Sequence, residues 1–100
     1  MKTCELKFHP VAKNEWYELD AEVRRQMKKK LGERLKNPHV KSARLRDMPG
    51  CFYKIKLKTV GYRLVYEVVG EDAEIVVWAI GKRERNQAYL SAKRRTDSVG

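Results

Sequence analysis

The sequence has few of the residues that break or cross-link a chain. Its 100 residues include six glycines, three prolines and two cysteines, whereas 42% are hydrophobic. This composition excludes a collagen-like, low-complexity or disordered chain. The length suits one domain and is too short for two independent cores. Two cysteines exclude a disulfide scaffold, and we expect Cys4 and Cys51 to be reduced thiols in the core.

Long hydrophobic runs are also missing. The longest, Ile75–Ile80, has six residues, whereas a membrane-spanning helix needs about 20. The first residues, Met1–Glu5, lack the hydrophobic region of a signal peptide. We therefore expect a soluble, cytoplasmic protein with no membrane partner.

The residue types behind many enzyme mechanisms are scarce or wrongly spaced. The two histidines, His9 and His39, are not placed beside the lysine-rich strand described below. We find no carboxylate pair, Cys/His dyad, glycine-rich phosphate loop or zinc-ligand spacing. A histidine-based ribonuclease is therefore disfavoured, and we expect no metal and no cofactor. Any catalysis must use lysine, arginine and tyrosine.

Positive charge is what the chain has in excess. Its 23 lysines and arginines face 13 acidic residues, which leaves a net charge of +10. Such a field attracts polyanions. The alternative is a solvated basic surface without a partner. The placement of the cations along the chain must decide between these two interpretations.

The first half of the chain predicts a strand and two helices. Residues Thr3–Phe8 alternate between polar and apolar, which indicates a half-buried strand. Pro10 suits the first turn of a short helix that runs to Asp20. Asp20 can cap a second helix, which Asn37-Pro38 ends. That helix has an apolar stripe with four-residue spacing, formed by Val23, Met27, Leu31 and Leu35.

The other faces of the second predicted helix are strongly basic. Residues 24–46 hold ten basic side chains and one acidic one, Glu33. An ordinary solvated helix face mixes both signs at i and i+4, whereas here the repulsion is largely uncompensated. We therefore expect a polyanion contact on this face. The helix cations are Arg24, Arg25, Lys28, Lys29, Lys30 and Arg34.

The second half predicts three strands and a short helix. From Cys51 onward, apolar residues alternate with Lys54, Lys56 and Lys58, so one strand face is a ladder of lysines. A turn at residues 59–61 leads into a strand over 62–69, and Ile75–Ile80 is apolar on both faces, as in a central strand. Gly81 ends that strand, and residues 84–95 form a short helix or ordered tail. The order β-α-α-β-β-β predicts an α+β domain, mainly antiparallel, with its helices on one sheet face.

Three segments of this predicted domain supply groups that suit a phosphodiester. The hairpin supplies Lys54, Lys56 and Arg63, the segment just past the central strand supplies Lys82, Arg83 and Arg85, and the segment after it supplies Tyr89. If these segments converge, the cations bind phosphate and Tyr89 stacks a splayed base, which is how single-stranded RNA is usually recognised. The alternative for Tyr89 is a half-buried ring that packs the C-terminal segment.

Several of these segments resemble, in order, motifs of the RelE toxins of bacterial type II toxin–antitoxin pairs. The resemblance covers about residues 3–95, which we take as one RelE-like domain (1–95), followed by a flexible tail (96–100). A RelE/ParE-type α+β fold is therefore implied. The segments that carry the resemblance are Lys28–Leu31, Leu45–Pro49, Lys54–Leu57, Gly61–Tyr66, Gly81–Arg85 and Tyr89.

The resemblance implies a ribosome-dependent endoribonuclease that cleaves mRNA in the ribosomal A site and stops translation. In the mechanism proposed for such toxins, a ribose 2′-hydroxyl attacks the adjacent phosphate without a metal. This leaves a 2′,3′-cyclic phosphate and a 5′-hydroxyl. Transferred to this chain, the resemblance implies that Lys56 is the general base and Arg83 the general acid. Lys54 and Arg63 would stabilise the charge of the phosphorane, and Tyr89 would orient the nucleotide. The implied contacts to ribosomal RNA come from Lys28, Lys29, Lys30 and Arg46.

The chemistry of Lys56 and Arg83 limits these roles. A lysine near its reference pKa of about 10.4 is protonated at neutral pH and accepts no proton. Crowding by Lys54, Arg63 and Arg83 should lower the pKa of Lys56 and make it a better base. Arginine hardly ever gives up its proton, so Arg83 is expected to act chiefly by electrostatics.

The resemblance also implies partners and leaves two rival functions open. It implies the 70S ribosome with mRNA, a RelB-like antitoxin that masks the basic face, and operator DNA bound indirectly through that antitoxin. One rival is a ParE-like toxin of the same fold that inhibits DNA gyrase by binding it. The other is a non-catalytic RNA-binding module. The cationic set around Lys56 favours the nuclease, because a protein binder does not need to surround a phosphate.

Overall fold

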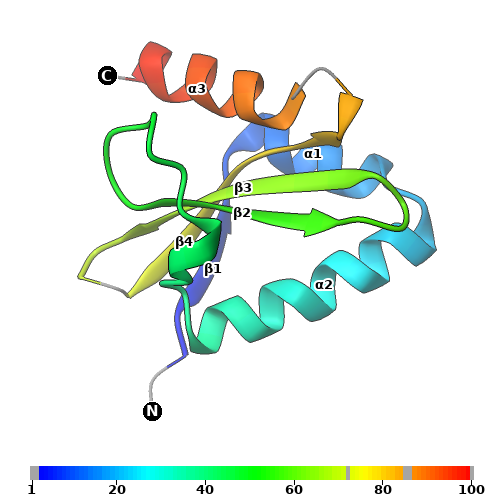
Figure 1. Cartoon of the computed structure of the whole chain (residues 1–100), viewed down its shortest axis with the longest axis horizontal. Helices are drawn as coiled ribbons and strands as arrows, with labels where there is room; N and C mark the ends of the chain where they lie inside the picture. The colour runs from blue at the N-terminus through cyan, green and yellow to red at the C-terminus, as the bar shows by residue number, and fades with distance from the viewer. Residues whose placement is uncertain (1–2, 72, 85–86, 100) are drawn as a thin grey trace.

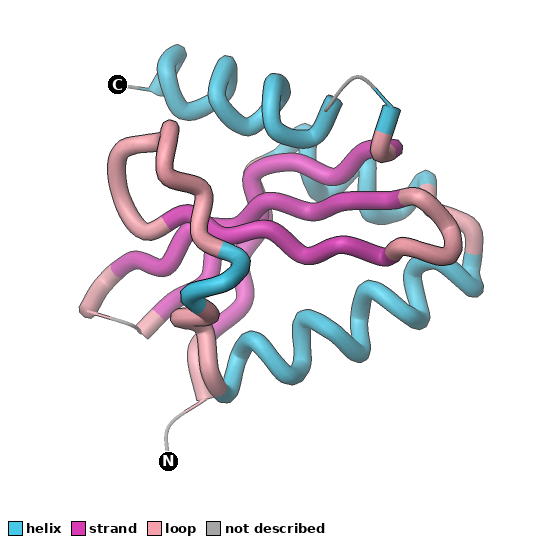
Figure 2. Tube along the Cα trace, in the orientation of Figure 1, coloured by secondary structure: helices cyan, strands magenta, loops and turns pink. Residues whose placement is uncertain are grey.

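The computed structural model describes residues 3–71, 73–84 and 87–99. They form one mixed four-stranded sheet with helices on both faces (Figures 1 and 2). No helix in these ranges is long and apolar enough to cross a membrane. The elements are β1 (Glu5–Phe8), α1 (Pro10–Glu18), α2 (Ala21–Lys36), the 3₁₀ turn η1 (Lys41–Ala43), β2 (Phe52–Leu57), β3 (Tyr62–Val69), β4 (Glu74–Lys82) and α3 (Gln87–Val99).

The strand order is β1-β4-β3-β2, so β4 is central, as its apolar run predicts. The β1–β4 pair is parallel, whereas β2–β3 and β3–β4 are antiparallel. The α+β prediction is therefore confirmed. β2 lies at the opposite edge of the sheet from β1, and its outer edge faces the viewer in Figure 1.

The helical hairpin forms where the sequence predicts it. His9 caps α1 by accepting a hydrogen bond from the Val11 N–H, and Pro10 occupies the first turn. Val23, Met27 and Leu31 of α2 are buried in the main core against one face of the sheet. Their four-residue spacing places them on one stripe, so the basic residues of the helix remain outside.

The placement of the C-terminal helix corrects one prediction. We expected all helices on one sheet face, but α3 covers the opposite face, where it completes a second core (Figure 1). That face carries apolar side chains of its own, and burying them requires a cover. The second core consists of Leu45, Met48, Phe52, Val65, Ala79, Ala88 and Ala92.

α3 is also longer than predicted, since it runs to Val99 and so includes most of the residues that we expected in a tail. The cysteines are both free thiols: Cys4 is buried and Cys51 is half-buried against the main core.

β4 contains an irregularity in its pairing with β3, and this irregularity directs neighbouring apolar side chains of β4 into both cores. Val65 pairs with Ala79 and Tyr66 with Val77, so Trp78 is an extra residue. This bulge shifts the alternation by one. Val77 therefore faces the main core, whereas Ala79 faces the second core under α3. The strand then continues one residue past Gly81, where we had expected it to end.

Candidate functional site: a cationic cleft at the β2–β3 turn and the end of β4

Strand register gathers the predicted cations on the α3 face of the sheet. Lys56 of β2 lies opposite Arg63 of β3, and Arg63 lies opposite Gly81 of β4. The alternate residues Ile55 and Leu57 are buried in the main core beneath the sheet. Period-two alternation therefore directs Lys54 and Lys56 to the same side as Arg63, as the lysine ladder predicts.

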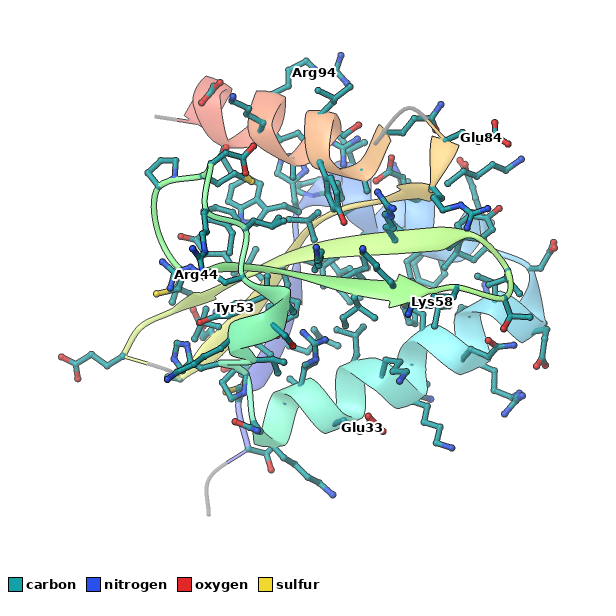
Figure 3. All side chains as sticks on the ribbon, in the orientation of Figure 1. Glu33, Arg44, Tyr53, Lys58, Glu84 and Arg94 are labelled. Atoms are coloured by element: carbon teal, nitrogen blue, oxygen red, sulfur yellow. The ribbon has the colours of Figure 1, made fainter. Side chains whose placement is uncertain are left out.

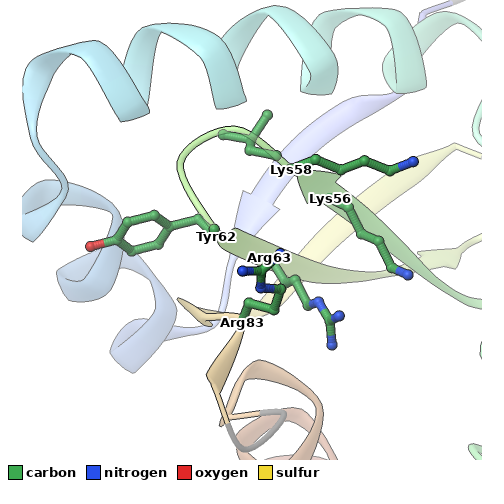
Figure 4. Close-up of a pocket in the computed structure, with 7 residues that line it drawn as sticks. Lys56, Lys58, Tyr62, Arg63 and Arg83 are labelled. Carbon is green, nitrogen blue, oxygen red and sulfur yellow. The ribbon is translucent and has the colours of Figure 1, made fainter.

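Arg83 joins this row through a backbone contact. Its N–H donates a 2.7 Å hydrogen bond to the carbonyl of Gly61, which ties the end of β4 to the β2–β3 turn. Gly61 has a φ of 69°, a left-handed conformation that glycine adopts without a Cβ penalty. Figure 4 shows Arg63 and Arg83 side by side, with Lys56 across from them.

These side chains line a cleft of about 200 Å³. No carboxylate of the described residues is part of its lining. A site with this charge is suited to a phosphate or a developing phosphorane. The lining residues are Lys56, Leu57, Lys58, Gly61, Tyr62, Arg63 and Arg83.

Neighbouring positive charge changes the acidity of Lys56. Its ammonium is exposed, and its pKa is lowered chiefly by the charge of Lys54, then by partial desolvation and by Arg63 and Lys58. The predicted direction is confirmed. One expected cause is not found, since Arg83 is not among the groups that lower this pKa.

Tyr89 closes one side of the cationic row from α3. The Arg63 guanidinium lies over its ring, 5.1 Å from the centroid. The ring also packs against the second core, and the buried hydroxyl has no hydrogen-bond partner among the described residues. Burial raises the pKa of this phenol, while Arg63 acts in the opposite direction. Tyr89 therefore both packs α3 and positions Arg63.

The remaining predicted contact residues lie outside the cleft. Lys28, Lys29 and Lys30 are exposed on α2, which packs on the other sheet face. Lys82 lines a separate hollow beside α1, and Arg46 lines one at the N-terminal end of β2. Arg85 lies outside the described residues.

Sequence reasoning missed one cation of the cleft. Lys58 lines it and helps to lower the pKa of Lys56. The signal was present, because Lys58 is the third rung of the same lysine ladder. β2 ends at Leu57, however, so period-two alternation alone does not place a residue beyond the strand.

The fold and the cleft define a small α+β protein with a cationic site suited to a phosphodiester. A model of the ParE toxin of type II toxin–antitoxin systems (parDE) matches residues 6–87. The mRNA interferase toxin RelE of Escherichia coli K12 is 48% identical over 90 residues, which cover 90% of this chain and 94% of that protein. A putative RelE-like toxin protein of E. coli is 46% identical over 91 residues, which cover 91% of this chain and 95% of that one.

Solved structures agree with these relatives. An arginine-to-alanine double mutant of E. coli RelE in the free state superposes with a TM-score of 0.83 at 43% identity, covering 93% of this chain and 97% of that one. The toxin in the intact E. coli RelBE toxin–antitoxin complex superposes with a TM-score of 0.76 at 46% identity, covering 82% and 99%. The chain belongs to the RelE family of the RelE/ParE toxins of type II toxin–antitoxin systems.

Proposed function

We propose that this chain is an endoribonuclease toxin, an mRNA interferase that cuts messenger RNA in the ribosomal A site and so inhibits translation. The observation that carries the proposal is that Lys56, Arg63 and Arg83 line one cleft. Within that cleft, neighbouring cations lower the pKa of Lys56. The relatives called mRNA interferase RelE are 48% identical over 90 residues.

The proposed reaction uses the message's own ribose as nucleophile. Lys56 Nζ accepts the proton of a 2′-hydroxyl, the 2′-oxygen attacks the adjacent phosphorus, and the bond to the 5′-oxygen breaks. The products are a 2′,3′-cyclic phosphate and a 5′-hydroxyl. Lys54 and Arg63 stabilise the phosphorane charge, and this step requires no metal.

Arg83 and Tyr89 act on the leaving group and the nucleotide. The Arg83 guanidinium stabilises the departing 5′-oxygen by charge, because it hardly ever releases a proton. A solvent water therefore supplies the proton that completes the 5′-hydroxyl, and Lys56 returns its proton to solvent. Tyr89 orients the nucleotide through its ring and through Arg63, which lies 5.1 Å from the ring centroid. The ribosome supplies the attack-ready geometry of the codon, which is worth many orders of magnitude in rate.

The proposed partners follow from the resemblance to RelE toxins and from the basic surface of the protein. Ribosomal RNA contacts Lys28, Lys29, Lys30, Arg46, Lys82 and Arg85, through charge rather than base reading. A RelB-like antitoxin covers the basic surface in a cytoplasmic complex, and that complex contacts operator DNA through the antitoxin. The RelBE complex of E. coli is the precedent for such a pair.

Two other functions compete with this one. A ParE-like gyrase inhibitor shares the fold, and the matching family model is that of ParE. A binding module would use the same cations without cleavage. The lowered pKa of Lys56 favours the nuclease, because it makes Lys56 a better proton acceptor, a property that phosphate binding does not need.

The test is cleavage of a defined message on purified ribosomes with an empty A site, using message without ribosomes as a control. We expect breaks in the A-site codon that carry a 2′,3′-cyclic phosphate. Arg83→Ala should slow them by about 10²–10³, as removal of one aimed donor does. Arg94→Ala, which removes an exposed arginine outside the cleft, should leave the rate unchanged. An intact message with the wild-type protein would favour the gyrase inhibitor.

A further inference from the structure

A second cationic hollow lies at the other end of β2. Its volume is about 390 Å³, and it is lined by Lys41, Arg44, Arg46 and Tyr53. Three of its four lining residues are therefore cations. None of the three forms an ion pair with a carboxylate in the described part of the chain. We call these four residues the β2-start pocket.

Backbone pairing holds the cations of the β2-start pocket in place. Arg44 forms an isolated antiparallel bridge with Tyr53, and the N–H of Leu45 donates to the carbonyl of Phe52 at 2.9 Å. The Arg44 guanidinium also donates to the carbonyl of Gly50 at 2.9 Å and lies over the Tyr53 ring at 5.7 Å. The loop that carries Arg44 is therefore fixed to the edge of the sheet before any ligand binds.

The floor of the pocket is ordered as well. The Tyr53 ring stacks on that of Tyr66 with centroids 5.5 Å apart, and its hydroxyl is 2.6 Å from His39 Nδ1. The Tyr66 hydroxyl in turn donates to the carbonyl of Pro38 at 2.7 Å. A pre-ordered floor of this kind reduces the conformational entropy that the protein loses when a ligand binds.

Charge and spacing identify the ligand class. Cations held together without an acidic partner repel one another, and an anion with several acceptor oxygens relieves that repulsion. Tyr53 and Leu57 mark the two sites along β2, and four residues of strand span roughly 13 Å. One phosphate group cannot fill both sites. In Figure 3, Arg44 and Tyr53 lie at one end of β2 and Lys58 lies at the other.

We propose that the β2-start pocket binds a second backbone phosphate of the RNA whose scissile phosphate occupies the cleft. The inference rests on the proposed function, transfers Arg46 from ribosomal RNA to this phosphate, and adds Lys41 and Arg44 as phosphate ligands beside it. Because these groups contact phosphate rather than base edges, they set the position of the RNA and not the sequence that is cut. The edge strand β2 then carries two phosphate sites along one RNA strand.

The experiment measures binding of a fluorescent heptanucleotide RNA whose 2′-hydroxyls are all O-methylated, so that no attack can occur. Anisotropy titrations at several salt concentrations give the affinity and its salt slope. The double variant Lys41→Ala/Arg44→Gln should lower the affinity about tenfold. It should also reduce the slope by about 0.7, the value for one phosphate of a single strand. The charge-matched control Lys36→Ala/Arg94→Gln removes two exposed cations elsewhere and should change both quantities much less.

Two further variants separate binding from folding. Lys41→Arg/Arg44→Lys keeps both charges and should retain the wild-type slope. Lys41→Ala alone removes an exposed side chain that makes no hydrogen bond or ion pair within the described residues, so it should keep the wild-type melting temperature and still weaken binding.

Vacant ribosomes serve as a second probe, because ribosomal RNA offers the same phosphate chemistry. A loss of affinity for the heptanucleotide supports a phosphate of the message. A loss for vacant ribosomes alone would overturn the proposal and would assign the pocket to a ribosomal phosphate instead. Affinities for both probes that match those of the charge-matched control would overturn the proposal. Since the blocked RNA cannot be cleaved, this result is independent of whether Lys56 and Arg83 catalyse.

Discussion

At the scale of the residue, the central feature is that like charges are arranged to change the acidity of one lysine. Lys54 is two positions from Lys56 on the same strand face, and its charge is the largest cause that lowers the pKa of Lys56. Arg63 faces Lys56 across the β2–β3 pair. The ladder therefore lowers the pKa of the lysine that we propose as the proton acceptor.

This arrangement predicts a shift in pH dependence. If neutral Lys56 is the base, single-turnover cleavage rises as pH passes upward through its lowered pKa. Lys54→Ala removes the largest cause of that lowering, so the pKa of Lys56 moves up and the rising limb of the profile moves to higher pH. Lys58→Ala removes the smallest cause and should move the limb less. The measurement is the rate on programmed ribosomes between about pH 6 and 10.

The control is Lys56→Ala, in which the rising limb should disappear. A limb at the same pH in wild type, Lys54→Ala and Lys56→Ala would show that another group titrates, and Lys56 would then act only through its charge.

At the scale of the element, one ion pair connects α1 and α3 to β4. Arg95 of α3 donates to Glu15 of α1 at 2.8 and 3.1 Å and to the carbonyl of Trp78 at 2.8 Å. Glu15 also accepts the N–H of Ile80 at 3.1 Å. β1 pairs with β4 no further than Val77, so these side chains satisfy backbone groups of β4 beyond the end of β1.

Removing Glu15 should therefore cost more than an average surface change. Glu15→Ala leaves the Ile80 N–H and the Arg95 guanidinium without this acceptor, and we expect the free energy of unfolding to fall by about 2 kcal/mol. Amide exchange at Ile80 should rise in parallel. Denaturant unfolding measures the first effect and hydrogen-exchange NMR the second.

Glu18→Ala is the matched control on the same helix, because Glu18 is exposed. It should change stability by less than about 0.5 kcal/mol. Equal effects of the two substitutions would show that the Glu15–Arg95 pair does not support β4.

At the scale of the whole molecule, one sheet contributes apolar side chains to two cores, one on each face. The cations of the cleft and of the β2-start pocket lie around the β2 edge of that sheet. The main core lies under α1 and α2, and the smaller core lies under α3. The net charge of +10 is thus carried by a scaffold that is apolar on both sheet faces. The cleft lies next to the smaller core, so the stability of α3 and the shape of the cleft are linked through Tyr89.

Truncations should separate the two parts of α3. A chain that ends at Arg95 keeps Ala88, Ala92 and the contacts of Arg95, so we expect it to lose less than about 1 kcal/mol of stability. A chain that ends at residue 86 exposes Phe52, Val65 and Ala79, which are 3%, 0% and 0% accessible in the full chain. We expect a loss of roughly 5 kcal/mol, comparable with the stability of a whole small domain.

Thermal melting and denaturant unfolding of both truncated chains measure these losses. Similar stability of the full chain and the chain that ends at residue 86 would show that the smaller core contributes little to the fold.

Local patterns were sufficient for much of this protein. The four-residue stripe of α2 and the period-two alternation of β2 were visible in the sequence because each depends on one element's own geometry. The same alternation correctly placed Lys54 and Lys56 on one face, and the position of Arg63 after a short turn placed it beside them. The family could also be recognised from the sequence, because its motifs are short and occur in a fixed order along the chain.

Long-range packing decided what those patterns could not. The side of the sheet that α3 covers depends on the apolar residues that β2, β3 and β4 together present on the second face. The Trp78 bulge, the Glu15–Arg95 pair and the β2-start pocket each join residues that are distant in sequence, so no single periodicity contains them. The sequence by itself determined which residues are buried within each element and which chemistry is available. Only the tertiary structure decided which surfaces meet, because that choice depends on the summed burial of several elements at once.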